Sequence, residues 1–212
     1  YKVQAKISPK RILHYDDRYN PESHVREVFC SLIKEGMTVV DAGAFIGYYT
    51  LLASKRVGNK GKVLSFEPDP INFKILAENI RINNIRNVKL FNKALGAKFG
   101  KLYFDRYSSD YVSISRRKSK LRIDVVPLDA IEQNVDLVKI DVIGAELEVL
   151  KGMESILNEG RVKVICEVYP DEEKKLGYSV EMLEKFLKEK GYRLSLIHIS
   201  EPTRPRLISY AV

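Results

Sequence analysis

Residues 37–70 constrain the fold of this chain more than any other stretch, because they carry strand, helix and strand signals in close succession. The β-branched run that ends at Val40 is typical of a strand buried on both faces. A helix is expected to begin near Tyr48 and to end at residues 58–61, which tolerate positive φ. A second strand is expected over residues 62–66. This succession predicts one βαβ unit.

Both strands of this unit end in residues suited to binding a ligand. Asp41 ends the first strand, and Gly43 and Gly47 then bracket a tight turn in which the backbone can approach a ligand closely. Glu67 ends the second strand, 20 residues after Gly47, where a nucleotide-binding βαβ unit carries its ribose-binding carboxylate. Pro68 follows and forces a turn. A carboxylate at position 67 can accept hydrogen bonds from two vicinal ribose hydroxyls at once.

The glycine spacing indicates which cofactor these residues suit. The G-x-G-x-x-G dinucleotide pattern is not met, because only Gly43 and Gly47 are present. A cofactor without a pyrophosphate is therefore expected. S-adenosylmethionine has a ribose, an adenine and a cationic amino-acid end, which Asp41 can receive. The alternative is a strand and a helix whose glycines serve packing alone.

Three motifs in this chain resemble those of the FkbM-type methyltransferases. They read DAGAFIGYYT, FEPDP and LVKIDVIGAELEVLKG, and the resemblance spans residues 38–168. It implies an S-adenosylmethionine-dependent enzyme on a Rossmann-like sheet. Two positions depart from the family pattern, which usually has Asn in place of Phe45 and an acid in place of Ile143.

The remaining patterns fit an α/β fold of the Rossmann-like class I methyltransferase type, with a mostly parallel sheet flanked by helices. Further parallel strands are expected over residues 87–92, 136–142 and 161–168. One helix is expected after Gly144. Between residues 100 and 128 the period changes to two, which predicts a short antiparallel β excursion.

Three parts of the chain are expected. Residues 1–36 form an irregular polar segment followed by a lead-in helix, and residues 37–194 form the methyltransferase domain. Residues 195–212 resemble translated sequencing-adapter DNA, so we expect a non-native tail and a sheet whose C-terminal strands are truncated.

The candidate site residues lie at the carboxyl ends of the predicted strands, where open α/β sheets bind ligands. Asp141 is the first candidate for a catalytic base, and Glu146 is the second. The candidate cofactor-binding residues are Asp41, Gly43, Phe45, Gly47, Glu67, Pro68, Asn92, Ala94 and Asp141. No metal ligands are assigned, because Ile143 removes a probable carboxylate from the family pattern and no Cys/His cluster suggests zinc.

Composition limits the choice of partners only weakly. The chain carries 36 basic and 28 acidic residues among 212, a net charge of +8 that permits a polyanionic partner. No apolar run approaches the length of roughly 20 residues that a membrane span needs. Cys30 and Cys166 fall in apolar patterns and are expected to be reduced core thiols of a cytoplasmic protein. The oligomeric state does not follow from the sequence.

The most favoured activity is O-methylation of a sugar or another small-molecule hydroxyl. A nucleic-acid (tRNA or rRNA) methyltransferase is disfavoured, because residues 141–144 lack the Asn/Asp-Pro-Pro-aromatic loop of amino-methylating enzymes. A non-catalytic S-adenosylmethionine-binding domain stays open because of Phe45 and Ile143. Tyrosines and arginines interleave over residues 103–122. This pattern suits a surface that binds a sugar, an anion or stacked bases, and it equally suits a hairpin face that is simply solvated.

Overall fold

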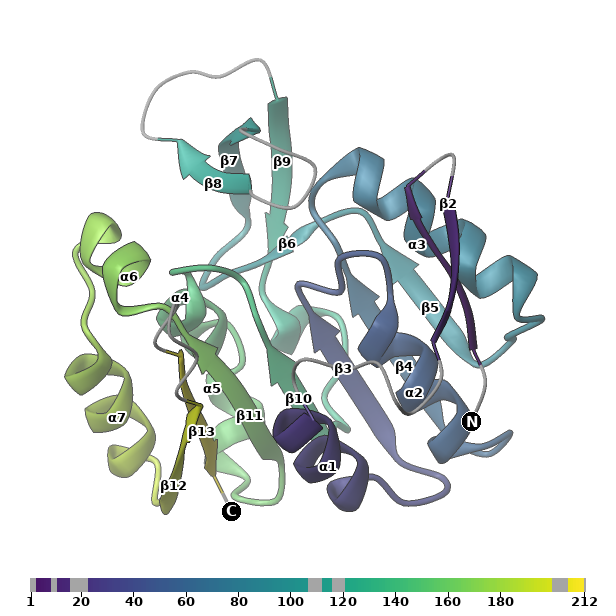
Figure 1. Cartoon of the computed structure of the whole chain (residues 1–212). Coiled ribbons are helices and arrows are strands. Elements are labelled where there is room, and N and C mark those ends of the chain that lie inside the picture. Colours follow the sequence, from purple (N-terminus) through teal and green to yellow (C-terminus); the bar gives the residue numbers. More distant parts are fainter. Residues whose placement is uncertain are drawn as a thin grey trace. The chain divides into compact units, whose positions relative to one another are not determined.

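The computed structural model describes residues 3–8, 11–15, 23–106, 112–115, 121–199 and 206–211. The chain divides into two compact units (Figure 1). The first unit comprises Tyr1–Asn92 and Val135–Lys139, and the second comprises Lys93–Asn134 and Ile140–Val212. Of the segment that interleaves tyrosines with arginines, residues 107–111 and 116–120 lie outside the described residues.

The first unit is built on parallel strands, as the sequence predicts. Strands β3 (Thr38–Ala42), β4 (Lys62–Phe66) and β5 (Val88–Phe91) pair in parallel, and β10 (Leu137–Ile140) lies beside β3. Every residue of β3 is buried, which explains its run of apolar and β-branched side chains.

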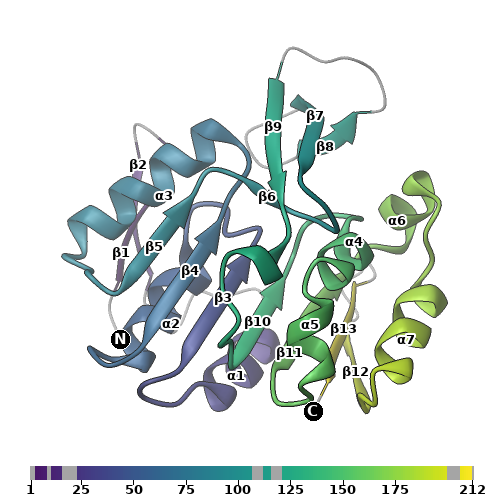
Figure 2. The ribbon, with the colours of Figure 1, turned by 180° about the vertical axis from the view of Figure 1, so that it is seen from behind.

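Three helices cover these strands: α1 (Ser23–Leu32), α2 (Tyr48–Val57) and α3 (Pro70–Ile82). Helices α1 and α2 lie in front of β3 in Figure 1 and behind it in Figure 2, so both cover the same face. Their core contact is an edge-to-face pair between Phe29 and Tyr49, with ring centroids 5.1 Å apart.

An antiparallel hairpin precedes α1, where the sequence analysis expected an irregular segment. It consists of β1 (Val3–Ser8) and β2 (Arg11–Tyr15), and β1 contacts α3. That expectation is wrong, because pairing of backbone amides and carbonyls forms a hairpin even where the side-chain alternation is weak.

In the second unit, β11 (Lys163–Val168) pairs antiparallel with β13 (Arg206–Ala211), which also pairs antiparallel with β12 (Leu194–Ile199). The expectation of truncated C-terminal strands is therefore wrong for this structure. An edge strand offers unpaired amides and carbonyls to any extended segment, so pairing here does not depend on a family-specific sequence. Whether residues 195–212 are native stays a prediction.

A second, smaller sheet confirms the predicted antiparallel excursion. Its order is β6 (Ala94–Leu95), β9 (Leu121–Val126), β7 (Gly100–Arg106), β8 (Val112–Ser115), and β7 is antiparallel to both of its neighbours. The short 3-10 helix η1 (Leu128–Ala130) follows β9.

The second unit contains four helices among its described residues: α4 (Glu146–Lys151), α5 (Glu154–Asn158), α6 (Pro170–Leu176) and α7 (Val180–Glu189). The single helix expected after Gly144 is broken between α4 and α5. A Cβ at Gly152 would stand 2.1 Å from the carbonyl oxygen of Gly96, and the Gly152 carbonyl accepts from the amide of Asp129 instead of continuing the helix. Tertiary packing therefore interrupts the helical pattern.

No helix within the described ranges is long and apolar enough to cross a membrane. Cys30 is half-buried and Cys166 is buried, and both are free thiols.

Candidate functional site

The turn that follows β3 is held rigidly by hydrogen bonds within the first unit. Gly43 and Gly47 adopt left-handed conformations, with φ of 82° and 95°. The amides of Gly43 and Ala44 both donate to the carbonyl of Phe66 at 3.0 Å, and the Gly47 amide donates to Ala44 at 2.8 Å. A Cβ at Gly47 would meet Leu76 Cδ1 at 2.5 Å, so glycine is required there for space as well as for conformation.

Phe45 occupies the middle of this turn with φ of 50°, a conformation that L-residues other than Asn and Asp rarely adopt. Its side chain is 37% exposed, although it is large and apolar. The resemblance places Asn here, and a left-handed conformation explains that preference. Phe45 therefore stores backbone strain in the turn predicted to bind the cofactor.

Glu67 ties the two turns of the βαβ unit together. Its Oε2 accepts from the amide of Phe45 at 2.7 Å, and its Oε1 accepts from the amide of Asp69 at 2.8 Å. The carboxylate is 5% exposed. Burial, with smaller contributions from the charges of Asp69 and Asp41, raises its pKa to about 8 against the opposing effect of the two amide bonds.

Asn92 and Pro68 shape the turn that begins at Glu67. The exposed Asn92 side chain donates from Nδ2 to the carbonyls of Glu67 and Pro68, at 2.8 and 3.0 Å. Asp69 then caps α3 by accepting at Oδ1 from the amides of Ile71 and Asn72. The structure thus brings the predicted residues Glu67, Pro68 and Asn92 into one hydrogen-bonded turn.

Asp41 is buried at the end of β3, and its Oδ2 accepts from Thr50 Oγ1 at 2.6 Å. Thr50 Oγ1 lies 2.8 Å from Ser65 Oγ, which extends the polar cluster to β4. Sequence reasoning missed this cluster and missed Lys139, which is 1% exposed and lies with Nζ 4.3 Å from the ring centroid of Tyr49. The signal in the sequence for this buried cation is the position of Lys139 inside the otherwise apolar run LVKI.

In the second unit, Asp141 directly follows β10. It is half-buried, and its Oδ1 accepts from Tyr169 Oη at 3.0 Å. Sequence reasoning selected Asp141 and missed Tyr169, because 28 residues separate the two. A hydroxyl donor fixes the orientation of the carboxylate and leaves it within reach of solvent.

Glu146 is enclosed, unlike Asp141. It has no exposed surface, and its Oε1 accepts from the Gly144 amide at 3.0 Å. Its Oε2 has no hydrogen-bond partner among the residues that the structure describes. Burial, followed by the charges of Glu173 and Asp141, raises its pKa to about 8. Glu146 therefore closes the turn, and contact with an acceptor would require that turn to open.

Ile143 lies between these two acids with φ of 55°, and Gly144 follows with φ of 98°. A left-handed conformation is an outlier for a β-branched residue. The second departure from the family pattern thus falls on a strained position, as Phe45 does. Ala94, the last predicted cofactor residue, is buried in β6 and pairs with Val125.

The first unit fits a cofactor that has a ribose and no phosphate. A phosphate cradle presents several free backbone amides at a helix start. Here the amides of Gly43, Ala44, Phe45 and Gly47 all donate within the protein. Each Glu67 oxygen takes one amide bond and keeps a second lone pair, which suits a pair of ribose hydroxyls.

Solved methyltransferases share this fold. An FkbM methyltransferase from Methylobacillus flagellatus has a TM-score of 0.62 at 20% identity, over 90% of this chain and 51% of that one. A SAM-dependent methyltransferase from Aquifex aeolicus has a TM-score of 0.55 at 22% identity, over 91% and 89%. A Streptococcus mutans structure in complex with SAH has a TM-score of 0.59 at 14% identity, over 91% and 97%. The fold therefore belongs to the Rossmann-like methyltransferases, as the sequence predicts.

Residues 41–194 match the Methyltransferase FkbM domain, so this chain belongs to the FkbM methyltransferase family, whose cofactor is S-adenosylmethionine. Methyltransferase sdnD of Sordaria araneosa is 28% identical in a 198-residue alignment that covers 74% of this chain and 74% of that protein. Methyltransferase 1 of Beauveria bassiana is 26% identical in a 145-residue alignment that covers 55% of this chain and 58% of that protein. The chain thus spans about half the length of the Methylobacillus protein. It spans 74% of the Sordaria protein's length and 58% of the Beauveria protein's length.

Proposed function

We propose that this protein is an S-adenosylmethionine-dependent O-methyltransferase that acts on a hydroxyl group of a sugar or another small molecule. The observation that carries the oxygen-acceptor part is the bond from Tyr169 to Asp141. It holds a half-buried carboxylate in one orientation at the end of a core strand. Such a carboxylate suits a base for a hydroxyl, which is a poor nucleophile until its proton is accepted.

Family membership and the geometry around Glu67 support the cofactor assignment. Glu67 would accept from the ribose hydroxyls, and Asp41 would balance the cationic amino-acid end. Asn92 and Pro68 would hold the Glu67 turn in place. When bound, S-adenosylmethionine supplies a sulfonium methyl group that is electrophilic without help from the protein.

Asp141 would orient the acceptor hydroxyl and take its proton, which is the one chemical task left to the protein. Tyr169 would act as a positioning residue, because its hydroxyl donates to Asp141 Oδ1 and would hold the carboxylate in one orientation. Glu146 is a poorer base, because its enclosed carboxyl group meets no solvent. It would set the shape of the turn that carries Asp141.

Transfer of a labelled methyl group tests this proposal. The protein is incubated with methyl-labelled S-adenosylmethionine and a panel of sugars, glycosides and phenols, with total RNA as a separate arm. Label in an alkali-stable ether of a small molecule supports the proposal. Label in RNA alone would establish the nucleic-acid alternative, and cofactor binding in calorimetry without any transfer would establish a binding domain.

We propose a cytoplasmic location, because Cys30 and Cys166 are both free thiols, the state that a reducing compartment maintains. Fractionation of cells that make the native protein tests this proposal, which requires the protein in the cytoplasmic fraction.

A further inference from the structure

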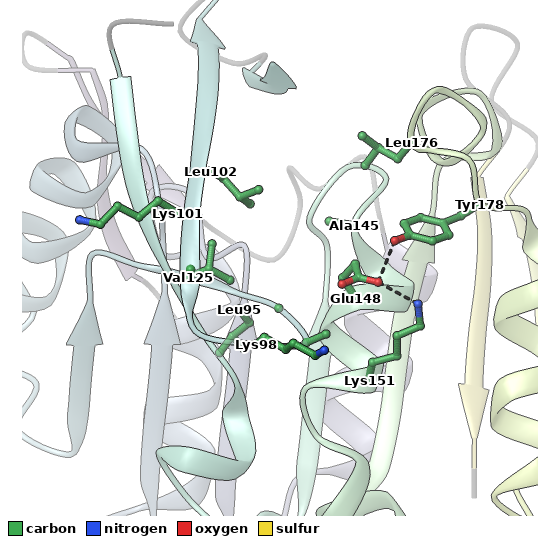
Figure 3. A pocket seen from close by; sticks show the side chains of 13 residues that line it. Leu95, Lys98, Lys101, Leu102, Val125, Ala145, Glu148, Lys151, Leu176 and Tyr178 are labelled. Atoms are coloured by element: carbon green, nitrogen blue, oxygen red, sulfur yellow. Dashed lines mark hydrogen bonds and ion pairs between the residues drawn. The ribbon is translucent and has the colours of Figure 1, made fainter. Parts of the chain in front are cut away.

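The second unit contains a cavity of about 650 Å³, which is within the usual size range of small-molecule sites. Strands β7 and β9 and residues 96–98 form one side of the cavity (Figure 3). Helices α4 and α6 and Tyr178, which follows α6, form the other side. Its apolar walls are contributed by Leu95, Leu102, Val125, Ala145 and Leu176. None of the predicted site residues lines this cavity, but Leu95 and Ala145 in its walls directly adjoin Ala94 and Glu146 in the sequence.

One polar cluster projects between these walls. Glu148 Oε1 accepts from Tyr178 Oη at 2.7 Å and from Lys151 Nζ at 2.8 Å (Figure 3). Lys151 Nζ also lies 5.1 Å from the centroid of the Tyr178 ring. Three side chains from two segments therefore hold one another in a defined arrangement, which is what a specific binding site requires.

The protonation states of this cluster follow from the same contacts. Partial burial raises the pKa of Glu148, but hydrogen bonds from Lys151 and Tyr178 outweigh it and hold that pKa below its usual range. Burial and the Glu148 carboxylate together raise the pKa of Tyr178 to about 12. At neutral pH Glu148 is therefore a carboxylate and Tyr178 is a neutral phenol.

This cluster keeps both accepting and donating capacity toward a ligand. Both bonds within it end on Glu148 Oε1, and Oε2 has no partner among the described residues. Lys151 uses one of its ammonium hydrogens on Glu148 and Tyr178 Oη can still accept. A ligand hydroxyl, which both donates and accepts, matches this set better than a group that only donates or only accepts.

The charge balance in the cavity favours a neutral ligand. Glu148 and Lys151 cancel one another, and the carboxylate would repel an anionic group. Lys101 pairs with Asp124 at 2.9 Å, and its ammonium group points away from the cluster (Figure 3). Lys98 is exposed and its charge helps to lower the pKa of Glu148, but solvent weakens the attraction that it would exert on an anionic ligand. The apolar walls and the Tyr178 ring suit the C–H face of a ring.

We propose that this cavity binds the acceptor as a neutral, hydroxylated ring, with Glu148 and Lys151 contacting ring hydroxyls and Tyr178 and Leu176 flanking the ring. The inference rests on the proposed function in so far as the ligand is the methyl acceptor. Binding of a ring does not itself require methyl transfer, so the two are tested separately.

Saturation-transfer NMR on the full chain tests the cavity with 4-nitrophenyl β-glucoside, β-galactoside, α-mannoside and α-rhamnoside, and with 4-nitrophenyl β-glucuronide as the anionic counterpart. We expect at least one neutral glycoside to bind more tightly than the glucuronide. Glu148→Leu should weaken that binding about 10-fold or more, as expected for a hydrogen bond to a charged group. Tyr178→Phe, which keeps the ring, should weaken it less than Tyr178→Ala.

Glu184→Leu is the matched control, because Glu184 forms an equivalent pair with Lys188 at 2.9 Å on α7 and lies outside the cavity. It should leave glycoside binding unchanged, and circular dichroism of every variant verifies folding. The proposal is overturned if no neutral glycoside binds, if Glu148→Leu and Tyr178→Phe both bind as wild type does, or if the glucuronide is preferred and Lys98→Ala removes that preference. Labelled methyl transfer to another acceptor would then still support the proposed function. Glycoside binding without any methyl transfer would refute the proposed function and leave the cavity assignment standing.

Discussion

The turns after β3 and β10 are built alike and held differently. Each follows a buried strand that has an aspartate within one residue of its end, and each contains a non-glycine residue at positive φ, Phe45 in one and Ile143 in the other. Each is also closed by a buried glutamate that accepts from a turn amide. Glu67 uses both oxygens, on amides from two different turns. Glu146 uses one oxygen, on an amide two residues away.

The turn after β3 is therefore preformed, whereas the turn after β10 keeps unused hydrogen-bonding capacity. The Glu67 turn is fixed from both sides, which suits a cofactor site that must be ready before binding. The Glu146 turn keeps a buried oxygen without a partner in the described part of the chain, beside the more exposed Asp141. We therefore expect mutations in the first turn to affect cofactor affinity and mutations in the second to affect turnover.

The largest expected effect is on turnover, from Asp141→Asn in the second turn. Loss of a general base typically lowers turnover by about 10²–10⁴-fold, while cofactor affinity should change far less. Labelled-methyl kinetics and calorimetry measure the two quantities. Tyr169→Phe should give a smaller loss of turnover, because the carboxylate stays in place and loses only the hydroxyl that orients it. Equal turnover of wild type and Asp141→Asn would leave positioning alone as the mechanism.

The next effect is on cofactor affinity, from Glu67→Ala in the first turn. We expect S-adenosylmethionine binding to weaken by about 1–3 kcal/mol, because two hydrogen bonds from the ribose hydroxyls to the Glu67 carboxyl group are lost. Calorimetry measures it. Glu78→Ala, on an exposed part of α3 where Glu78 pairs with Arg81, is the control. Unchanged affinity in a folded Glu67→Ala protein would remove Glu67 from the site.

The third effect concerns pH and stability. Folding raises the pKa of Glu146 from 4.5 to about 8, so between these values the folded protein keeps a proton that the unfolded chain has lost. The contribution of Glu146 to stability is therefore complete below pH 4.5 and is lost as pH rises through about 8. Glu67 should behave in the same way.

Urea denaturation at several pH values from 4.5 to 8 measures this dependence. Glu146→Gln keeps an acceptor for the Gly144 amide and cannot ionise, so its free energy of unfolding should fall less steeply with pH. A slope identical to that of the wild type would show that Glu146 titrates normally.

The smallest effect comes from relieving backbone strain. Ile143→Asn should raise the free energy of unfolding by about 1 kcal/mol, because Asn tolerates the left-handed conformation that a β-branched residue does not. Phe45→Asn should raise the free energy of unfolding less. Phe is not β-branched, so less strain is relieved, and the substitution removes more apolar contact. Ile71→Asn, at an exposed position with no positive φ, is the control and should not stabilise the protein. A loss of stability in Ile143→Asn as large as in the control would contradict the strain assignment.

Short-range chemistry explains what could be predicted from the sequence. Helix α2 begins at Tyr48 and β4 spans Lys62–Phe66, both as expected, and Pro70 opens α3 as proline often opens a helix. Ser179 caps α7 in the same way, accepting from the Met182 amide. Each of these features depends on residues within one or two turns of chain, so periodicity and capping rules identify them.

The sequence by itself determined the family, the parallel strands of the first unit and the acids at their carboxyl ends. Only the tertiary structure decided that Glu67 holds the amide of Phe45, 22 residues away, that Tyr169 orients Asp141, and that Glu148, Lys151 and Tyr178 meet in one cavity. It also broke the predicted helix at Gly152, where the backbone of Gly96 approaches. These contacts join residues far apart in the chain, and no local propensity encodes them, because each depends on which elements pack together.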